Sequence, residues 1–311
     1  MTLFEKEVLE GLSGVPKRLS SRFFYDAAGD KLFQDIMRMP EYYLTDCEFE
    51  IFQTQRAEIL NALPRTPFDL IELGAGDGLK TKVLLQHFLD QGRQFRYMPI
   101  DISGNVLNTL QDSLHREMPQ LDVAPQQGEY FRVLAGLKDL VSRPKVVLFL
   151  GANIGNLKQA DARRFLFELR DALALDDMVL IGFDLKKDPE IILSAYNDPA
   201  GITAAFNLNL LTRINREMQG DFNIDQFKHW EVYNPMSGET RSYIVSKTKQ
   251  DVFVGTLNKT FHFEAWEPIE VELSLKYSRQ DIDSLASDTG FSPVCFFHDK
   301  RNYFVDTLWK K

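Results

Sequence analysis

The stretch from Phe68 to Thr81 constrains the fold of this chain more than any other. It reads FDLIELGAGDGLKT, which is a short apolar run, an acid, three glycines at alternate positions and the start of an amphipathic segment. Glycines let the chain turn tightly and let backbone N–H groups approach a ligand that a Cβ would keep away. This order of strand, glycine turn and helix is typical of nucleotide-type cofactor sites in α/β proteins.

Two cofactor classes are compatible with this turn. A nicotinamide site prefers G-x-G-x-x-G, but Leu79 stands where the third glycine would fall. The carboxylates of Glu72 and Asp77 lie close to the glycines in sequence and would repel a pyrophosphate. They suit a cationic ligand with an amino-acid tail, so we favour S-adenosylmethionine (SAM). A glycine-rich turn without a ligand is the alternative, because one glycine motif is weak evidence.

From residue 68 to about residue 185, apolar runs alternate with helical patterns, which predicts βαβ units, a parallel sheet and an α/β fold. The expected strands are Phe68–Leu73, Phe95–Ile100, Leu121–Val123, Val146–Leu150 and Met178–Phe183. Thr45 or Asp46 is expected to cap a helix from Cys47 to Leu63, and a further helix is expected at Phe131–Leu140.

After Asp184 the alternation of strands and helices ends. Residues of period two then predict antiparallel strands, of which the longest expected one is Phe261–Tyr277. Two final runs, Val294–Phe297 and Tyr303–Leu308, are expected to rejoin the parallel sheet as its antiparallel edge.

Composition and charge narrow the class of protein. A net charge of −9 over 311 residues disfavours a nucleic-acid surface, which needs clustered Lys and Arg. Cys47 and Cys295 are far apart in sequence and indicate reduced cysteines in a cytoplasmic protein. The five histidines are scattered singly, so we expect no metal. No apolar run is long enough to span a bilayer, so we expect no membrane partner. We also expect a monomer.

Ligands of parallel sheets lie beyond the carboxyl ends of the strands. Asp101 ends the second strand, where an acid can bind ribose hydroxyls; the alternative role is a helix N-cap. Glu129 and Tyr130 follow the third strand and could hold the edge and face of adenine. The fourth strand leads into Gly151–Asn156, where a methyl acceptor would sit. Its asparagines can accept a hydrogen bond from an amine, or they serve only as turn residues.

Further motifs follow one another along nearly the whole chain. They are FYD at 24–26, PEYY at 40–43, ELGAG at 72–76, FLGxxIGN at 149–156, DLxKD at 184–188, AYxDxAGxTxxFN at 195–207 and ExSxK at 272–276. In these motifs the chain resembles the histidine-specific, SAM-dependent methyltransferases. The resemblance implies a Rossmann-like core from residues 60–190 and 278–311, with a second, α+β substrate-binding domain from residues 1–59 and 191–277. It also implies methylation of the α-amino group of free L-histidine, up to the trimethyl product of ergothioneine biosynthesis.

The resemblance assigns roles to individual residues. Tyr25 and Tyr42 correspond to tyrosines that contact the substrate. Asn156 and Tyr196 correspond to residues that hold its amino and carboxylate groups. The implied site comprises Asn156 and Tyr25 for catalysis; Tyr25, Tyr42, Gly151, Asn156, Tyr196, Glu272 and Ser274 for the substrate, the last two at its imidazole; and Glu72, Gly74, Gly76, Lys80, Asp101, Glu129 and Tyr130 for the cofactor. From local sequence alone, the tyrosines could equally be core, and the period-two run of Glu270, Glu272 and Ser274 could be a solvated strand face.

One position departs from the family. Ser242 aligns near a methionine that packs on the imidazole in the typical enzyme, so the pocket is expected to be wider or more polar there. A methyltransferase for another small amine or aromatic amino acid is therefore the second interpretation. A third interpretation, from another class of protein, is a non-catalytic SAM-binding protein. Asn156, Tyr196 and Glu272 argue against it, since a protein that only binds SAM has no physical need for all three.

Overall fold

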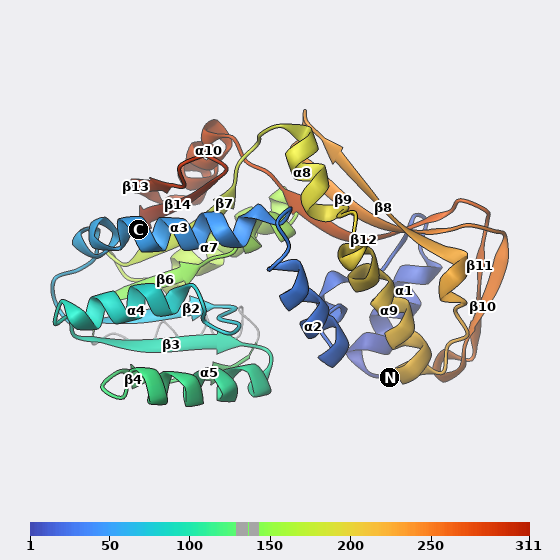
Figure 1. Cartoon of the computed structure of the whole chain (residues 1–311), viewed down its shortest axis with the longest axis horizontal. Helices are drawn as coiled ribbons and strands as arrows, with labels where there is room; N and C mark the ends of the chain where they lie inside the picture. The colour runs from blue at the N-terminus through green and yellow to red at the C-terminus, as the bar shows by residue number, and fades with distance from the viewer. Residues whose placement is uncertain (129–135, 137–142) are drawn as a thin grey trace. The chain divides into compact units, whose positions relative to one another are not determined.

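The computed structural model describes residues 1–128, 136 and 143–311 (Figure 1). The chain divides into two compact units. Unit 1 consists of Met1–Tyr43 and Lys187–Ser274, and unit 2 consists of Leu44–Lys186 and Leu275–Lys311. Each unit is thus assembled from two segments that are far apart in the sequence.

Unit 2 is organised around one eight-stranded sheet. Its strands are β2 (Phe68–Leu73), β3 (Phe95–Asp101), β4 (Asp122–Val123), β5 (Gln126–Gln127), β6 (Lys145–Phe149), β7 (Met178–Asp184), β13 (Ser292–His298) and β14 (Phe304–Lys310). The order across the sheet is β13-β14-β7-β6-β2-β3-β4, and β5 pairs with β3. The strands from β7 to β4 pair in parallel, whereas β14 is antiparallel to both β7 and β13. The predicted α/β fold and its antiparallel edge are confirmed.

The helices of unit 2 follow from the same sequence patterns. They are α3 (Tyr43–Ala62), α4 (Thr81–Asp90), α5 (Gly104–Glu117), η2 (Asn153–Asn156, a 3₁₀ turn), α7 (Gln159–Ala172) and α10 (Arg279–Thr289). Every residue of β2 and β6 is buried, as expected for central strands of a sheet covered on both faces. Figure 1 shows β2 and β3 with the helices that follow them, α4 and α5. The helix expected at Phe131–Leu140 lies outside the described residues.

Unit 1 contains a smaller sheet of four strands in the order β1-β12-β9-β8. Its strands are β1 (Lys17–Arg18), β8 (Phe227–Asn234), β9 (Glu239–Ser246) and β12 (Pro268–Leu275), and β10 (Gln250–Val254) and β11 (Lys259–Phe263) form a separate antiparallel pair. The helical elements are α1 (Leu3–Ser13), η1 (Ser21–Phe23), α2 (Ala27–Ile36), α8 (Pro189–Tyr196), α9 (Ile202–Met218), η3 (Ile224–Gln226) and η4 (Gly255–Leu257).

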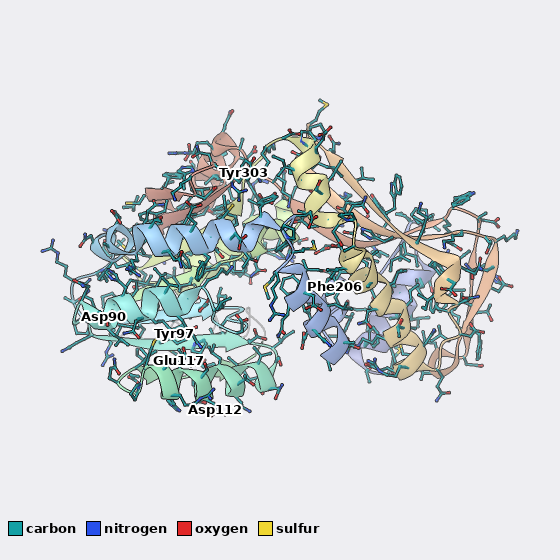
Figure 2. The ribbon with its side chains drawn as sticks, in the orientation of Figure 1. Asp90, Tyr97, Asp112, Glu117, Phe206 and Tyr303 are labelled. Atoms are coloured by element: carbon teal, nitrogen blue, oxygen red, sulfur yellow. The ribbon has the colours of Figure 1, made fainter. Side chains whose placement is uncertain are left out.

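A shared apolar core explains why the two segments of unit 1 belong together. Val8 of α1 and Phe24 join Phe206 of α9, which is labelled in Figure 2, and Ile244 and Ile269 of the sheet in one buried cluster. The rings of Phe24 and Phe206 lie 4.8 Å apart between centroids. Burial of such side chains stabilises the fold by about 1.5–3 kcal/mol each, so the N-terminal segment is held by residues more than 150 positions away.

One expected helix start is wrong, and one expected domain boundary differs from the division into units. The helix expected from Cys47 begins at Tyr43, so Thr45 and Asp46 lie inside its first turn and do not cap it. The first division between the compact units falls at 43/44, whereas the sequence placed the expected domain boundary at 59/60. The physical reason is that α3 belongs to unit 2, where Ile51 and Phe52 are fully buried. The other two boundaries fall at 186/187 and 274/275, near the expected 190/191 and 277/278.

The single strand expected at Phe261–Tyr277 is two strands, β11 and β12. The chain turns between them at Trp266, whose φ is 67°, a value uncommon outside glycine. The turn is held because Trp266 donates its N–H to Ser246 O at 2.7 Å and Glu267 accepts from Glu264 N at 2.8 Å. In the described ranges, no helix has both the length and the apolar character of a membrane span.

Candidate active site

The glycine turn after β2 uses backbone conformations that favour glycine. Gly74, Gly76 and Gly78 have φ values of 72°, 55° and 66°, in the left-handed region where a Cβ is strained. Gly78 is also closely packed, because a Cβ there would lie 2.6 Å from the side chain of Leu110. The turn therefore depends on glycine for its conformation and, at position 78, for its packing.

The end of β3 is bound to this turn. The N–H groups of Gly74 and Ala75 donate to Ile100 O at 2.8 and 3.2 Å, and the N–H of Gly76 donates to Asp101 Oδ2 at 3.3 Å. The N-cap of α5 is Ser103, which accepts from Val106 N, so the alternative capping role of Asp101 is wrong. The carboxylate of Asp101 lies beside the glycines and also accepts from Ser103 N at 2.9 Å.

Glu72, the acid before the glycines, is buried between two hydroxyl donors. Thr81 Oγ1 donates to Oε1 at 2.6 Å, and the hydroxyl of Tyr97, a residue labelled in Figure 2, donates to Oε2. Burial raises the pKa of Glu72 from its ordinary 4.5 to about 7, although the two hydroxyls and Lys80 oppose the rise. Both oxygens are thus engaged by the fold, and Glu72 fixes the start of α4 against β3.

The raised pKa of Glu72 predicts a specific pH dependence of stability. A carboxyl whose folded pKa is raised binds its proton more tightly in the folded state. Its stabilising effect is therefore present below about pH 4.5 and is lost as pH rises through about 7. The difference corresponds to roughly 3 kcal/mol. In urea unfolding across this window, wild type is expected to lose that amount relative to Glu72→Gln. Parallel stability curves for the two proteins would contradict the assignment.

Lys80 precedes α4 and pairs with a residue that the sequence analysis missed. Its ammonium contacts Oε2 of Glu48 on α3, while Oε1 of Glu48 accepts from Gly151 N at 2.8 Å. A Cβ on Gly151 would lie 3.6 Å from Lys80 Nζ. Burial alone would lower the pKa of Lys80, but Glu48 raises it above the ordinary value. The cation is thus held at the carboxyl edge of β6.

The loop after β6 is tightly constrained. Gly151 and Ala152 have φ values of 70° and 57°, and a left-handed alanine is uncommon. Gly155 packs on the backbone of Leu275, because a Cβ there would lie 2.7 Å from the carbonyl oxygen. Gly155 and Ile154 are buried, whereas the side chain of Asn156 is exposed at the end of the turn. Glu129 and Tyr130, the other expected cofactor residues, lie outside the described residues.

In unit 1 the three predicted tyrosines belong to one aromatic group. Tyr25 packs edge-on against Phe33 and Phe206, with centroids 5.5 and 5.8 Å apart. Phe33 packs against Tyr42 at 6.5 Å, and Tyr42 packs against Tyr196 at 6.4 Å. Tyr25 retains 43% of its surface exposed and Tyr196 only 6%. The structure thus brings together three residues that the sequence separates by up to 171 positions.

Tyr196 is fixed at both ends. Its hydroxyl lies 2.9 Å from Ser274 Oγ on β12, and its carbonyl oxygen accepts from Nε2 of His229 on β8 at 2.9 Å. Burial lowers the pKa of His229, so this imidazole is neutral and its proton is on Nε2. The sequence analysis gave His229 no role, since a single histidine in an alternating strand carries no signal for its partner.

The two acids of β12 have different partners. Glu270 Oε1 accepts from Arg241 at 2.5 Å, which is an ordinary ion pair on a partly exposed sheet. Glu272 Oε2 instead accepts from the hydroxyl of Ser242 on β9 at 3.3 Å. Ser242 is 1% exposed, so its hydroxyl is directed at Glu272 inside the unit. Ser242, the residue that departs from the family pattern, thus donates a hydrogen bond to Glu272, the residue predicted to bind the imidazole.

The chemistry of these residues fits a ligand that carries both charges. In unit 2 the glycine turn allows close approach, Asp101 offers a carboxylate, and Lys80 offers an ammonium to an amino-acid carboxylate. Among the residues that the structure describes, no group of His, Cys, Asp and Glu could hold a metal ion. The parallel sheet, the glycine turn and this set of charges define an α/β SAM-dependent methyltransferase.

Comparisons with known proteins identify the family. A family model described as histidine-specific, SAM-dependent methyltransferase matches residues 4–311. A histidine N-alpha-methyltransferase of Mycolicibacterium smegmatis is 34% identical over 96% of this chain and 92% of its own length. One from Mycobacterium tuberculosis is 33% identical over 98% and 94%. A 4-dimethylallyltryptophan N-methyltransferase of Penicillium roqueforti is 24% identical over 93% and 88%. The chain belongs to the histidine-specific, SAM-dependent methyltransferase family and is an N-methyltransferase that uses SAM as co-substrate.

Proposed function

We propose that this protein methylates the α-amino group of free L-histidine, up to the trimethyl product, as a step of ergothioneine biosynthesis. The observation that carries the proposal is the environment of Glu272. Its carboxylate accepts from Ser242, and Ser274, two residues further along β12, is bound to Tyr196. Membership of the family and two relatives named histidine N-alpha-methyltransferases support the same substrate.

The environment of Glu272 favours an imidazole over other rings. An imidazole offers an N–H donor and a second nitrogen that accepts, whereas an indole offers one donor and a phenyl ring none. Glu272 accepts the imidazole N–H, and the hydroxyl of Ser274 donates to the other nitrogen. This arrangement selects one neutral tautomer of the substrate ring.

The remaining roles follow from the chemistry of methyl transfer to nitrogen. SAM, when bound, supplies a methyl group on a sulfonium, and an unprotonated amine displaces it. Asn156 accepts an N–H of the α-amino group and orients the nitrogen lone pair without adding a charge. Tyr25 and Tyr42 hold the substrate carboxylate, and Tyr196, whose one hydroxyl proton is donated to Ser274, keeps Ser274 in place and excludes water. The rate enhancement comes mainly from alignment, which can contribute on the order of 7–11 kcal/mol.

A site that makes few hydrogen bonds to the α-amino nitrogen can transfer several methyl groups to it in succession. Each methyl removes one N–H donor, so a site that accepts three methyls must rely on few hydrogen bonds to that atom. Asn156 provides a single amide at an exposed loop position. An α-amino group has a pKa of about 7.7–8 in peptides and a higher one in a free amino acid, so the unprotonated fraction of the substrate reacts, and water or a tyrosine hydroxyl takes the proton.

A panel assay tests the substrate. Purified protein and SAM labelled in the methyl group are incubated with each free amino acid, tryptamine and histamine. The proposal predicts label transfer to histidine and none to histamine, which lacks the carboxylate. Equal transfer to tryptophan, or transfer to histamine alone, would contradict it.

A methyltransferase for another aromatic amino acid is the second candidate. Two observations favour it: the serine at position 242, and a relative whose name gives 4-dimethylallyltryptophan as its substrate. The two candidates differ in what Ser242 does. For histidine, the serine hydroxyl holds the Glu272 carboxylate that binds the ring, whereas an indole needs only the space that a small residue leaves.

We therefore expect Ser242→Ala to raise the KM for histidine about fivefold with kcat unchanged, since it removes one long hydrogen bond to a charged group. Steady-state kinetics measure this change. The matched control is Ser246→Ala, on the same strand, whose hydroxyl donates to Thr248 O at 2.8 Å and not to Glu272. A KM for histidine that is unchanged in Ser242→Ala would favour the second candidate.

A further inference from the structure

Four ionisable side chains of unit 2 form a cluster that the proposed reaction does not explain. Glu48 on α3 contacts the ammonium of Lys80, and the charges of Glu72 on β2 and Asp306 on β14 also act on it. Three carboxyl groups share one cation, and Glu48 and Asp306 have no exposed surface. Buried carboxylates that face one another cannot all be ionised, so at least one of them holds a proton.

Both carboxyl oxygens of Glu48 have hydrogen-bond donors as partners. Its Oε2 contacts the ammonium of Lys80, and its Oε1 accepts from Gly151 N at 2.8 Å. Both oxygens thus act as acceptors, which suits a carboxylate and not an acid. Lys80 retains 22% of its side-chain surface exposed, so part of this side chain can still contact a ligand.

Asp306 is the partner of Glu48 on the sheet side. It lies directly opposite Gly182 of β7, and a Cβ on Gly182 would lie 2.6 Å from Glu48 Oε1. Glu48 therefore reaches over a glycine to meet Asp306. Within the described residues, neither oxygen of Asp306 receives a donated hydrogen bond. Burial, and then the charge of Glu48, raise the pKa of Asp306 well above its ordinary value, against the opposing effect of Lys80.

We propose that Asp306 is a positioning residue that acts as a neutral acid. Its carboxyl O–H donates a hydrogen bond to Glu48, and Glu48 thereby holds the Lys80 ammonium and the Gly151 N–H at the cofactor edge of the sheet. The proposal rests on the cofactor role of Lys80 in the proposed function. A neutral Asp306 leaves Glu48 as the one carboxylate paired with Lys80. An ionised Asp306 would repel Glu48 and displace it from both contacts.

The chemistry of asparagine makes the test sharp. Asp306→Asn keeps a hydrogen-bond donor of the same shape but cannot ionise, so it mimics the protonated acid. Asp306→Ala removes the donor. Lys80→Met reports the direct contribution of the ammonium. Thr307→Val, at the adjacent buried position of β14, controls for general effects on that strand.

The measurement is the Kd for SAM by isothermal titration calorimetry on the full chain, with folding checked by thermal unfolding. SAM binding requires no amino-acid acceptor, so the result is independent of whether histidine is the substrate. We expect Asp306→Asn and Thr307→Val to stay within about twofold of wild type, and Asp306→Ala and Lys80→Met to bind at least about tenfold more weakly.

Three results would overturn the proposal. The first is Asp306→Asn that is folded and as weak as Asp306→Ala, which would mean that the ionised carboxylate is needed. The second is Asp306→Ala with wild-type affinity. The third is Lys80→Met with wild-type affinity, because positioning of Lys80 would then not serve the cofactor. Where Asp306→Ala does not fold, Asp306→Asn decides alone, since an amide can replace a neutral acid but not a carboxylate.

Discussion

Replacement of Glu272 by alanine is expected to lower kcat/KM for histidine about 100-fold and to leave the Kd for SAM within about twofold of wild type. The reason is that a hydrogen bond to a charged group contributes about 1.5–3 kcal/mol, and 1.4 kcal/mol corresponds to a factor of ten. Removing the carboxylate also leaves the imidazole N–H unpaired in a desolvated site. Steady-state kinetics with histidine and calorimetry with SAM measure the two quantities separately.

Glu270→Ala is the matched control for this prediction. Glu270 lies two residues before Glu272 on β12, but its carboxylate pairs with Arg241 in a partly exposed ion pair. Such pairs contribute little, so Glu270→Ala is expected to keep histidine turnover within about threefold. Equal loss in both variants would mean that β12 as a whole was disturbed, and unchanged turnover in Glu272→Ala would show that this carboxylate does not bind the substrate.

Asn156→Ala is the second change with a large expected effect. Its kcat is expected to fall about 100-fold with a small change in the KM for SAM, because misplacement of a reacting atom by about 1 Å costs about this factor. The surrounding loop provides the precision: Gly151 donates to Glu48, and Gly155 is packed against the backbone of Leu275. Single-turnover kinetics with saturating SAM and histidine report the chemical step directly.

Asn153→Ala tests whether the effect belongs to position 156. Asn153 lies in the same loop, and its N–H donates to Leu150 O, a bond that the substitution preserves. We expect this variant to retain a kcat within about threefold of wild type. If Asn153→Ala lost as much as Asn156→Ala, the two asparagines would be structural turn residues, which was the alternative that the sequence left open.

The sheet of unit 2 was predictable because its signals are local. The bounds of β2 agree with the apolar run Phe68–Leu73, and the glycines that follow it adopt the left-handed conformations that their sequence suggests. The position of Asp101 beside the glycine turn was predictable for the same reason, since parallel strands end at one edge. The spacing of apolar residues and the positions of turn residues were therefore the basis for predicting the sheet of unit 2.

The errors arose where distant residues decide the structure. The membership of α3 in unit 2 depends on burial of Ile51 and Phe52 in that unit, and helical periodicity does not reveal which unit buries a helix. The turn at Trp266 interrupts a regular alternation by one residue of positive φ. The local signal of a break was Pro268, at which β12 begins.

The side-chain contacts that the sequence did not predict have the same origin. Glu48 reaches Lys80 and Gly151 across 32 and 103 positions, and Ser242 reaches Glu272 across 30. In the sequence of α3, Glu48 is one of several charged residues. Only the tertiary structure distinguishes it from its neighbours, because there its side chain reaches Gly182 and the loop after β6.

The most direct test of the central claim is tandem mass spectrometry of the product formed from histidine and SAM by the purified protein. We predict a mass gain of one to three methyl groups. In the fragment spectrum, every methyl is expected on the α-amino nitrogen and none on the imidazole. Methylation on an imidazole nitrogen would contradict the account, because the ring would then lie at the methyl donor and not at Glu272.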